Sequence, residues 1–324
     1  MKIDPLSVTP SPHSLAVGIS PGIFPYLGGS VSPDLLRSIV AVCGGAIVSG
    51  KQGAKLAAKT PGVLVDPAAY GQRATMDSEP LFDYDEWLMR QQAAGVPLIL
   101  TDTPRIRNDD RSGLRKALAR WAAIDEAILV VLPIEPWWLR DGLPCLTEEV
   151  RAAGRPVAIV LLHRYNGFDA ARTVAGLLTL MSHVKPVPVV LLRCDVSAIG
   201  AVAHGAFAGF VGWSANTRHG PLPMRRPGRA EDSDDPDDSP SVLVPSLHSY
   251  FKTSTLPAFA RSRPADLLRC GDPVCRGESL LRIAELSEDD LQAGRLLAAR
   301  HNVASTERIA RRILSAAEPR DAWW

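Results

Sequence analysis

The segment Pro156-Val-Ala-Ile-Val-Leu-Leu162 is a short apolar run rich in valine, isoleucine and leucine. A run of this kind is typical of a strand with both faces buried, as in a parallel sheet. Runs of the same type recur along the chain: Leu15–Ile19, Gly62–Val65, Pro97–Thr101, Ala127–Leu132, Val187–Leu192 and Phe207–Gly212.

Segments with a helical pattern alternate with these runs. They are Ser32–Val42, Tyr84–Ala94, Gly113–Ile124, Thr147–Ala153, Asp169–His183 and Val196–His204. Several begin with a capping residue, such as Ser32 before Pro33, whose side-chain oxygen can accept a first-turn N–H. Strand–helix alternation over about 250 residues predicts a (β/α)8 TIM barrel. A doubly wound open sheet is the alternative, but no Gly-x-Gly-x-x-Gly follows the first run to support a dinucleotide site.

The composition is that of a globular protein with a large core. The chain has 324 residues, 46% of them hydrophobic, and contains no apolar run long enough to span a membrane. We expect a barrel over residues 1–260 and a small C-terminal appendage over residues 261–324. The polar N-terminal segment and the odd count of 5 cysteines favour a cytoplasmic protein with reduced thiols.

The charge is unevenly distributed along the chain. The formal net charge is +1, yet six acidic residues cluster between Glu231 and Asp238, so the remainder is distinctly basic. A basic body suits a polyanionic partner such as a nucleic acid. The acidic run lies among prolines, and we interpret the stretch near residues 228–240 as a solvated, disordered loop.

Two carboxylates stand where predicted strands end. Asp66 follows Val63–Val65, and Asp102 follows Leu98–Thr101. In a barrel the carboxyl ends of neighbouring strands meet at one face, where the chemistry takes place. Two carboxyl groups in one cleft suit acid/base or nucleophilic work, because burial and mutual repulsion separate their pKa values.

A metal site is indicated near the C-terminus. Cys270-Gly-Asp-Pro-Val-Cys275 is followed by 25 residues and then His301, at the head of an amphipathic segment. Thiolates, a carboxylate oxygen and an imidazole are the ligands of small structural zinc sites, so Cys270, Asp272, Cys275 and His301 are the predicted set. A reduced surface cysteine pair and a local disulfide are the alternatives.

The chain resembles the tRNA-guanine transglycosylase superfamily. That family carries Cys-x-Cys-x-x-Cys, a 25-residue gap and His-Asn, and here His301 precedes Asn302 while Asp272 replaces the middle cysteine. Asp66-Pro-Ala-Ala-Tyr70 is similar to the family's Asp-Ser-Gly-Gly-aromatic segment. Further similar segments, collinear between about Gly62 and Leu314, are Asp102-Thr-Pro104, Arg120-Trp121, Ile199–Gly205 and Asn216–Gly220.

The resemblance implies a zinc-containing enzyme that exchanges guanine for a 7-deazaguanine base in tRNA or DNA. It implies Asp66 as the catalytic carboxylate, Tyr70 as the ring that stacks on the base and Asp102 as the reader of the guanine edge. It also places His163 and Arg218 at the substrate-binding rim. A homodimer, or a heterodimer with an active subunit, is consistent with the family.

The chain departs from the family at the expected nucleophile, since we align Phe207 with that aspartate. Three accounts are open. Asp66 is itself the nucleophile, Asp195 at the end of the preceding strand takes over the role, or the protein is a catalytically silent relative. The glycine pair that admits the base is replaced by Ala68 and Ala69, which narrows the expected pocket.

Overall fold

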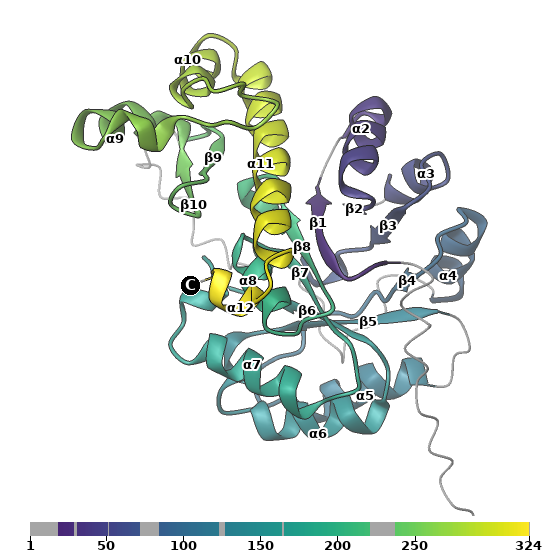
Figure 1. Ribbon diagram of the computed structural model, residues 1–324. Coiled ribbons are helices and arrows are strands. Elements are labelled where there is room, and N and C mark those ends of the chain that lie inside the picture. Colours follow the sequence, from purple (N-terminus) through teal and green to yellow (C-terminus); the bar gives the residue numbers. More distant parts are fainter. Residues whose placement is uncertain are drawn as a thin grey trace, which may run out of the picture.

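The computed structural model describes residues 19–28, 31–50, 52–71, 84–122, 127–163, 165–220 and 237–323. Its centre is a parallel sheet with the strand order β3-β2-β1-β8-β7-β6-β5-β4 (Figure 1). Cα atoms of the two outermost strands, β3 and β4, lie within 8 Å of each other, so the sheet nearly closes into a (β/α)8 barrel. The predicted fold class is confirmed. The strands are β1 (Gly22–Leu27), β2 (Ala46–Ser49), β3 (Val63–Asp66), β4 (Ile99–Leu100), β5 (Ile128–Ile134), β6 (Val157–Leu161), β7 (Val189–Cys194) and β8 (Ala208–Gly212).

Helices cover the outside of the barrel (Figure 1). Their sequences contain their own start and stop signals. In the first of them the Ser32 hydroxyl accepts the N–H of Leu35 at 3.3 Å, and Gly44 ends the helix with φ +76°. The helices are α2 (Pro33–Cys43), α3 (Gly53–Ala57), α4 (Tyr84–Ala93), α5 (Arg111–Ala122), α6 (Leu143–Ala153), α7 (Thr173–His183) and α8 (Ser197–Ala203).

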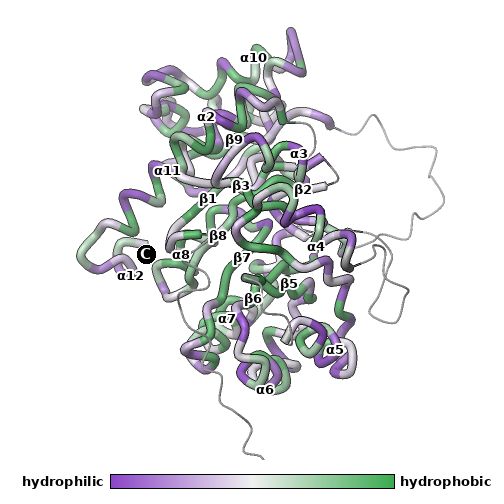
Figure 2. The backbone as a smooth tube through the Cα atoms, turned by 90° about the vertical axis from the view of Figure 1, so that its right-hand side faces the viewer, coloured by the Kyte–Doolittle hydropathy of each residue, from purple (hydrophilic) through white to green (hydrophobic). Residues whose placement is uncertain are grey.

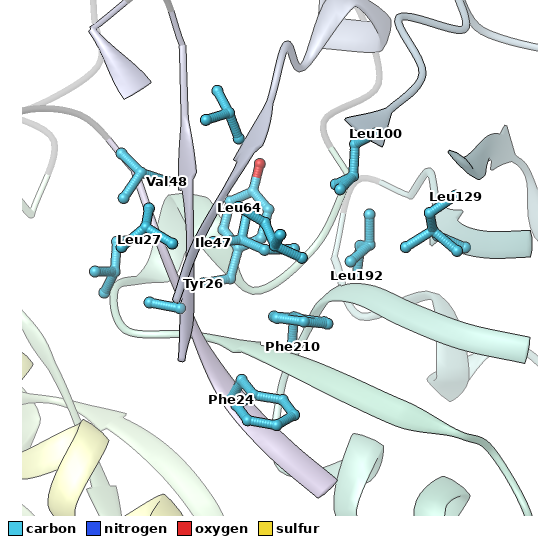
Figure 3. Packing of buried hydrophobic residues seen from close by; sticks show 14 of the residues in the cluster. Phe24, Tyr26, Leu27, Ile47, Val48, Leu64, Leu100, Leu129, Leu192 and Phe210 are labelled. Carbon is cyan, nitrogen blue, oxygen red and sulfur yellow. The ribbon is translucent and has the colours of Figure 1, made fainter. Parts of the chain in front are cut away.

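Side chains alternate between the barrel interior and the helix-covered exterior, as strand geometry requires. On β6, Ala158 and Val160 belong to the inner cluster, whereas Val157 and Ile159 belong to the outer cluster. Figure 3 shows inner residues from several strands meeting at the centre, including Tyr26, and the stacked rings of Phe24 and Phe210 lie 5.4 Å apart. Hydrophobic colouring follows the central strands in Figure 2.

The C-terminal appendage consists of a β-hairpin and helices. The hairpin is β9 (Ser241–Val244) with β10 (Ser249–Lys252), and the helices are α9 (Leu256–Ser262), α10 (Leu281–Asp289), α11 (Leu291–Leu314) and α12 (Pro319–Trp323). Residues of β9 share a small core with Cys270 and Leu280, so the hairpin packs with the appendage. Helix α11 joins both parts, because its last turns pack against α8 (Figure 1).

Several predicted boundaries were wrong. The first strand of the described chain is Gly22–Leu27, not Leu15–Ile19, of which residues 15–18 lie outside the described residues. Pro25 within the strand disguised it, because proline is depleted from strand interiors. The four-residue strand Ala46–Ser49, flanked by glycines, was not predicted. Helix α7 begins at Thr173 rather than Asp169, and α6 begins at Leu143 rather than Thr147.

Most of the acidic run lies outside the described residues, which resume at residue 237. Asp237 accepts hydrogen bonds from Ser239 and Ser254, and Asp238 forms an ion pair with Arg295 at 3.4 Å. Within the described part of the chain, no helix combines the length and the apolar character needed to cross a membrane.

Candidate metal centre and barrel mouth

The four predicted metal ligands converge in the appendage. The ligand atoms of Cys270, Asp272, Cys275 and His301 all lie within 4.8 Å of one another, and all four residues are buried. The Asp272 carboxylate lies 2.8 Å from the Cys270 sulfur and 2.9 Å from Nδ1 of His301, which in turn lies 3.1 Å from the Cys275 sulfur. Ligand atoms around a tetrahedral zinc are about 3.3–3.8 Å apart. To hold a metal ion, the hydrogen-bonded pairs would have to move apart and the more distant pairs, separated by up to 4.8 Å, would have to move closer.

A second layer of contacts orients these ligands. Nε2 of His301 donates to the carbonyl of Leu243 at 2.7 Å, which directs Nδ1 at the cluster, where a metal ion would displace the proton of Nδ1. Oδ1 of Asp272 accepts the N–H of Cys275 at 2.8 Å, and Oδ2 accepts the hydroxyl of Ser305 at 2.7 Å. Each ligand is thus held in a binding orientation, and the chemistry of the donor set fits a metal.

Protons are shared unevenly among the four groups, and the hydrogen bond with Cys270, together with burial, raises the pKa of the Cys275 thiol above its ordinary value. A hydrogen bond from Cys275 lowers the pKa of the Cys270 thiol to about 5. Burial lowers the pKa of His301, but hydrogen bonds with Asp272 and Cys270 outweigh it and raise the value to about 9. Burial works against ionisation of Asp272, yet hydrogen bonds from His301, Cys270 and Ser305 hold its pKa below the ordinary range. A thiolate and a carboxylate side by side attract a cation.

Asp66 lies at the carboxyl end of β3, where both of its carboxylate oxygens accept hydrogen bonds. The hydroxyl of Tyr26, from β1, donates to Oδ2 at 2.6 Å, and the hydroxyl of Tyr70 donates to the same atom at 2.5 Å. Oδ1 accepts the N–H of Ala68 at 2.8 Å. Asp66 is 0% exposed, and Tyr70, in the short helix η1 (Ala69–Gly71), is 1% exposed. Asp66 and Tyr70 therefore form one closed network at the barrel mouth.

Arg193 covers this network. Strand β7 shifts register between Leu191 and Cys194, and Arg193 takes φ +53° there. Such a bulge redirects a side chain. The Arg193 guanidinium carbon lies 5.3 Å from the ring centre of Tyr26 and 5.9 Å from that of Tyr70. Burial raises the pKa of both tyrosines, and the charge of Asp66 raises it further. The tyrosines therefore remain neutral donors.

Asp102 follows β4 and has an unused acceptor. It is 5% exposed, and its Oδ1 has no hydrogen-bond partner within the described chain. Burial raises the pKa of its carboxyl, while Arg120 acts in the opposite direction. The strand end around it is fixed, since the hydroxyl of Thr101 accepts the N–H of Val131 at 2.9 Å. Asp102 is thus a buried carboxyl that a ligand donor would satisfy.

The remaining predicted residues lie on the rim formed by the loops after β6, β7 and β8. Asp195 caps α8, since its Oδ1 accepts the N–H of Ser197 at 2.9 Å, and its Oδ2 accepts the side-chain amide of Asn166 at 2.9 Å. His163 is half-buried, and its Nδ1 accepts the N–H of Tyr165 at 3.2 Å. Arg218 is 9% exposed and lies over the Tyr250 ring at 3.6 Å. Asp195 is not part of the hydrogen-bond network around Asp66.

The position assigned to the missing nucleophile requires correction. Phe207 precedes β8, and its N–H bonds to the carbonyl of Val189 at the start of β7. It therefore lies at the amino end of the barrel, opposite the site, where no strand-end chemistry takes place. The segment after Gly212 that does reach the mouth, Trp213–Gly220, contains no carboxylate. Within the described part of the segment after β8 there is thus no carboxylate, and Phe207 does not mark the position of one.

Tyr26 was missed, because its strand was not recognised. The signal was present in Gly22-Ile-Phe-Pro-Tyr-Leu27, an apolar run interrupted only by Pro25. Nothing in the sequence indicated the bulge that turns Arg193 over the tyrosines.

Comparisons with known proteins add little to this description. No family model matches the chain, and no curated protein matches it. Among solved structures, a 3-hexulose-6-phosphate synthase is 18% identical with a TM-score of 0.35, over 59% of this chain and 89% of that one. A triosephosphate isomerase from Bartonella henselae is 14% identical with a TM-score of 0.33, over 60% and 92%. The fold assignment rests on the strand order itself.

Proposed function

We propose that the chain is a relative of the guanine transglycosylases that exchanges guanine for a 7-deazaguanine base in tRNA or DNA. The observation that carries the proposal is the buried cluster of Cys270, Asp272, Cys275 and His301. These residues have the family's spacing, and their convergence supports the resemblance. No comparison supplies independent evidence for the activity, so the proposal depends on the experiment below.

The bound metal in this proposal is zinc. Two thiolates, one carboxylate oxygen and one imidazole nitrogen form a tetrahedral shell with no open position, which is typical of structural rather than catalytic zinc. The ion would hold the hairpin and α11 together, since His301 also bonds to the carbonyl of Leu243 on β9.

The proposed reaction takes place at the barrel mouth. A carboxylate oxygen of Asp66 forms a bond to C1′ of a guanosine, the bond from C1′ to N9 breaks, and guanine leaves with the electron pair and takes up a proton. A nitrogen of the incoming 7-deazaguanine then attacks C1′, loses its proton and releases the carboxylate. Asp102 would accept a hydrogen bond from the exocyclic amine of the base, because its Oδ1 is buried without a partner within the described chain.

A second candidate function is a non-catalytic subunit that binds nucleic acid or an active partner. It is favoured by the closed state of Asp66, which is 0% exposed and bonded to Tyr26, Tyr70 and Ala68. A nucleophile must have a lone pair directed at C1′, so catalysis requires the Tyr70 segment and Arg193 to move. A binding subunit requires no such movement.

Labelled guanine separates the two functions. We expect purified protein, incubated with labelled guanine and either tRNA or duplex DNA, to place label in one polymer, and we expect Asp66→Asn to abolish this. Asp195→Asn makes the same chemical change at the alternative nucleophile on the same barrel face, and Asp169→Asn, outside both candidate positions, is the control.

Each outcome has one meaning. Label that enters a polymer with wild-type protein but not with Asp66→Asn supports exchange at Asp66. If Asp195→Asn alone abolishes it, Asp195 is the nucleophile. If neither polymer gains label, while the protein binds one of them or restores exchange by a partner transglycosylase, the non-catalytic function is supported instead.

A further inference from the structure

Four basic side chains gather at the carboxyl ends of three adjacent strands. His163 follows β6, Arg193 lies at the end of β7, and Arg218 and His219 lie in the loop after β8. We refer to these four residues as the basic rim. Three of them are half-buried and therefore reachable from solvent, while Arg218 lies deeper.

Backbone contacts hold the three loops together. The N–H of His163 donates to the carbonyl of Gly220 at 3.1 Å, and the side chain of Arg193 donates from Nε to the carbonyl of His219 at 3.1 Å and from Nη2 to the carbonyl of Asn216. Burial lowers the pKa of His219, and the charges of Arg193, Arg218 and His163 lower it further. The positive charges are therefore close enough to affect one another and are fixed in place.

Arg218 is the buried member of the basic rim. It is 9% exposed, and its Nη1 lacks a hydrogen-bond partner within the described chain, although Tyr250 and the charge of Asp195 both act on the guanidinium. The neighbouring carboxylate, Asp195, already accepts bonds from Ser197 and Asn166. A buried N–H group without a partner is costly, and an anion would satisfy Nη1, which is unpaired within the described chain.

We propose that the basic rim is a binding site for a phosphate group. The loops after the seventh and eighth strands of a barrel frequently form such a site, and here they supply Arg193, Arg218 and His219. A guanidinium presents paired N–H groups that match phosphate oxygens, and imidazoles add further donors. The ring of Tyr250 supports the back of the Arg218 guanidinium, so that its edge is left for the ligand.

The phosphate comes either from the backbone of a polynucleotide or from a small phosphorylated molecule. The inference about the site holds for both and does not require base exchange. If the proposed function is correct, the rim is the place where the nucleic acid backbone passes next to the Asp66 network.

The test uses probes that contain no guanine. We expect wild-type protein to bind a short oligothymidylate, inorganic phosphate or both, as measured by calorimetry. Arg218→Gln and Arg193→Gln should each weaken binding by about tenfold to a hundredfold, since each removes a charge-assisted hydrogen bond. Arg115→Gln is the matched control with the same charge change, because Arg115 lies on α5 with its side chain 70% exposed.

The two sources give different results. Oligothymidylate binding that weakens with salt, with a slope that falls by about 0.7 in each rim variant, identifies a polynucleotide backbone. Binding of inorganic phosphate alone identifies a small phosphorylated ligand. Either result supports the site.

The proposal is overturned if wild-type protein binds neither probe, or if both rim variants bind as Arg115→Gln does. Thermal unfolding identifies a variant that fails to fold. If Arg218→Gln does not fold, the binding measurements on Arg193→Gln and His219→Gln test the site instead. Wild-type protein that binds oligothymidylate through the rim but inserts no guanine would retain this site and refute base exchange.

Discussion

The metal cluster and the Asp66 network are both buried and fully hydrogen-bonded, but they are prepared for different events. In the cluster, the bonds around Asp272 and His301 leave Nδ1 of the imidazole and both sulfurs directed at one point. At the barrel mouth, the bonds from Tyr26, Tyr70 and Ala68 occupy both carboxylate oxygens of Asp66, which is 0% exposed. The first arrangement can take up an ion by adjusting the spacing of its ligand atoms. The second must open before it can act on a ligand.

Replacing His301 should produce the largest effect of any single change. His301→Ala removes one ligand and leaves Asp272 buried without its imidazole partner, which typically costs about 3–5 kcal/mol. We expect the metal content to fall from about one ion per chain to none. We also expect hydrogen exchange in the appendage to accelerate, because metal binding and local folding are coupled.

His248→Ala is the control for this change. His248 lies in the same appendage, stacked on Trp323 with ring centres 5.7 Å apart, and is not one of the ligands. It should keep its metal. If elemental analysis finds no metal in wild-type protein purified without chelators, the prediction of a metal site is contradicted. The main support for the family resemblance is then lost as well.

Substitution of Asp66 tests the second region, the hydrogen-bond network at the barrel mouth. Asp66→Asn keeps the shape of the side chain but removes the negative charge of the carboxylate that accepts hydrogen bonds from two tyrosine hydroxyls. Turnover should drop by on the order of a hundredfold or more if Asp66 is the nucleophile. Unfolding should become easier by about 1.5–3 kcal/mol, as expected for hydrogen bonds to a charged group.

Tyr26→Phe separates these two effects, because it removes one donor and leaves the carboxylate. It should lower the free energy of unfolding by about 1 kcal/mol. Near-normal turnover of Asp66→Asn would contradict the catalytic role and leave Asp66 as a structural residue.

The sequence predicted the metal cluster better than the mouth, for a physical reason. Three of the four ligands lie within Cys270–Cys275, so their proximity follows from chain connectivity, and the fourth lies at the family's spacing. The Asp66 network joins β1, β3 and β7, and its formation depends on the register of a whole barrel. Alternation of apolar runs was enough to predict the barrel, but not the bulge that turns Arg193 inward.

The misplaced nucleophile position has a similar cause. Phe207 and Gly212 are five residues apart, yet they lie at opposite ends of one strand. A strand-end argument therefore depends on knowing where a strand ends, which is the least certain part of reading a sequence. The run Phe207–Gly212 was identified correctly, but the site was assigned to its wrong end.

Asn302 links the two regions, and its loss should have an intermediate effect. Its Oδ1 accepts the N–H of Leu243 at 2.8 Å, and its Nδ2 donates to the carbonyls of Trp213 and Ser241 at 2.9 Å each. Asn302→Ala leaves these backbone groups unpaired, so we expect a loss of about 1–3 kcal/mol in the free energy of unfolding. Asn302→Asp keeps the acceptor but directs a buried carboxylate oxygen at two carbonyls, so we expect it to lose at least as much at pH 7.

Metal content reports on the coupling between the regions. If the hairpin and the barrel depend on each other, Asn302→Ala should release metal to a chelator faster than wild-type protein does. Equal release rates in the two proteins would mean that the metal centre is independent of the barrel mouth.

Asp102 should give the smallest effect, and one that changes with pH. Burial raises the pKa of this carboxyl in the folded protein above its value in the unfolded chain. The folded state therefore binds the proton more tightly, so the stabilising effect of protonation is fully present below the unfolded pKa and is lost as the pH rises through the folded pKa. Asp102→Asn resembles the protonated form at every pH. We expect the variant to unfold at a higher temperature than wild-type protein at pH 7 and at the same temperature near pH 3, measured by thermal melts across this range. A variant that is less stable at pH 7 would show that the Asp102 carboxylate has a stabilising partner, and it would then no longer be available to read the edge of a base.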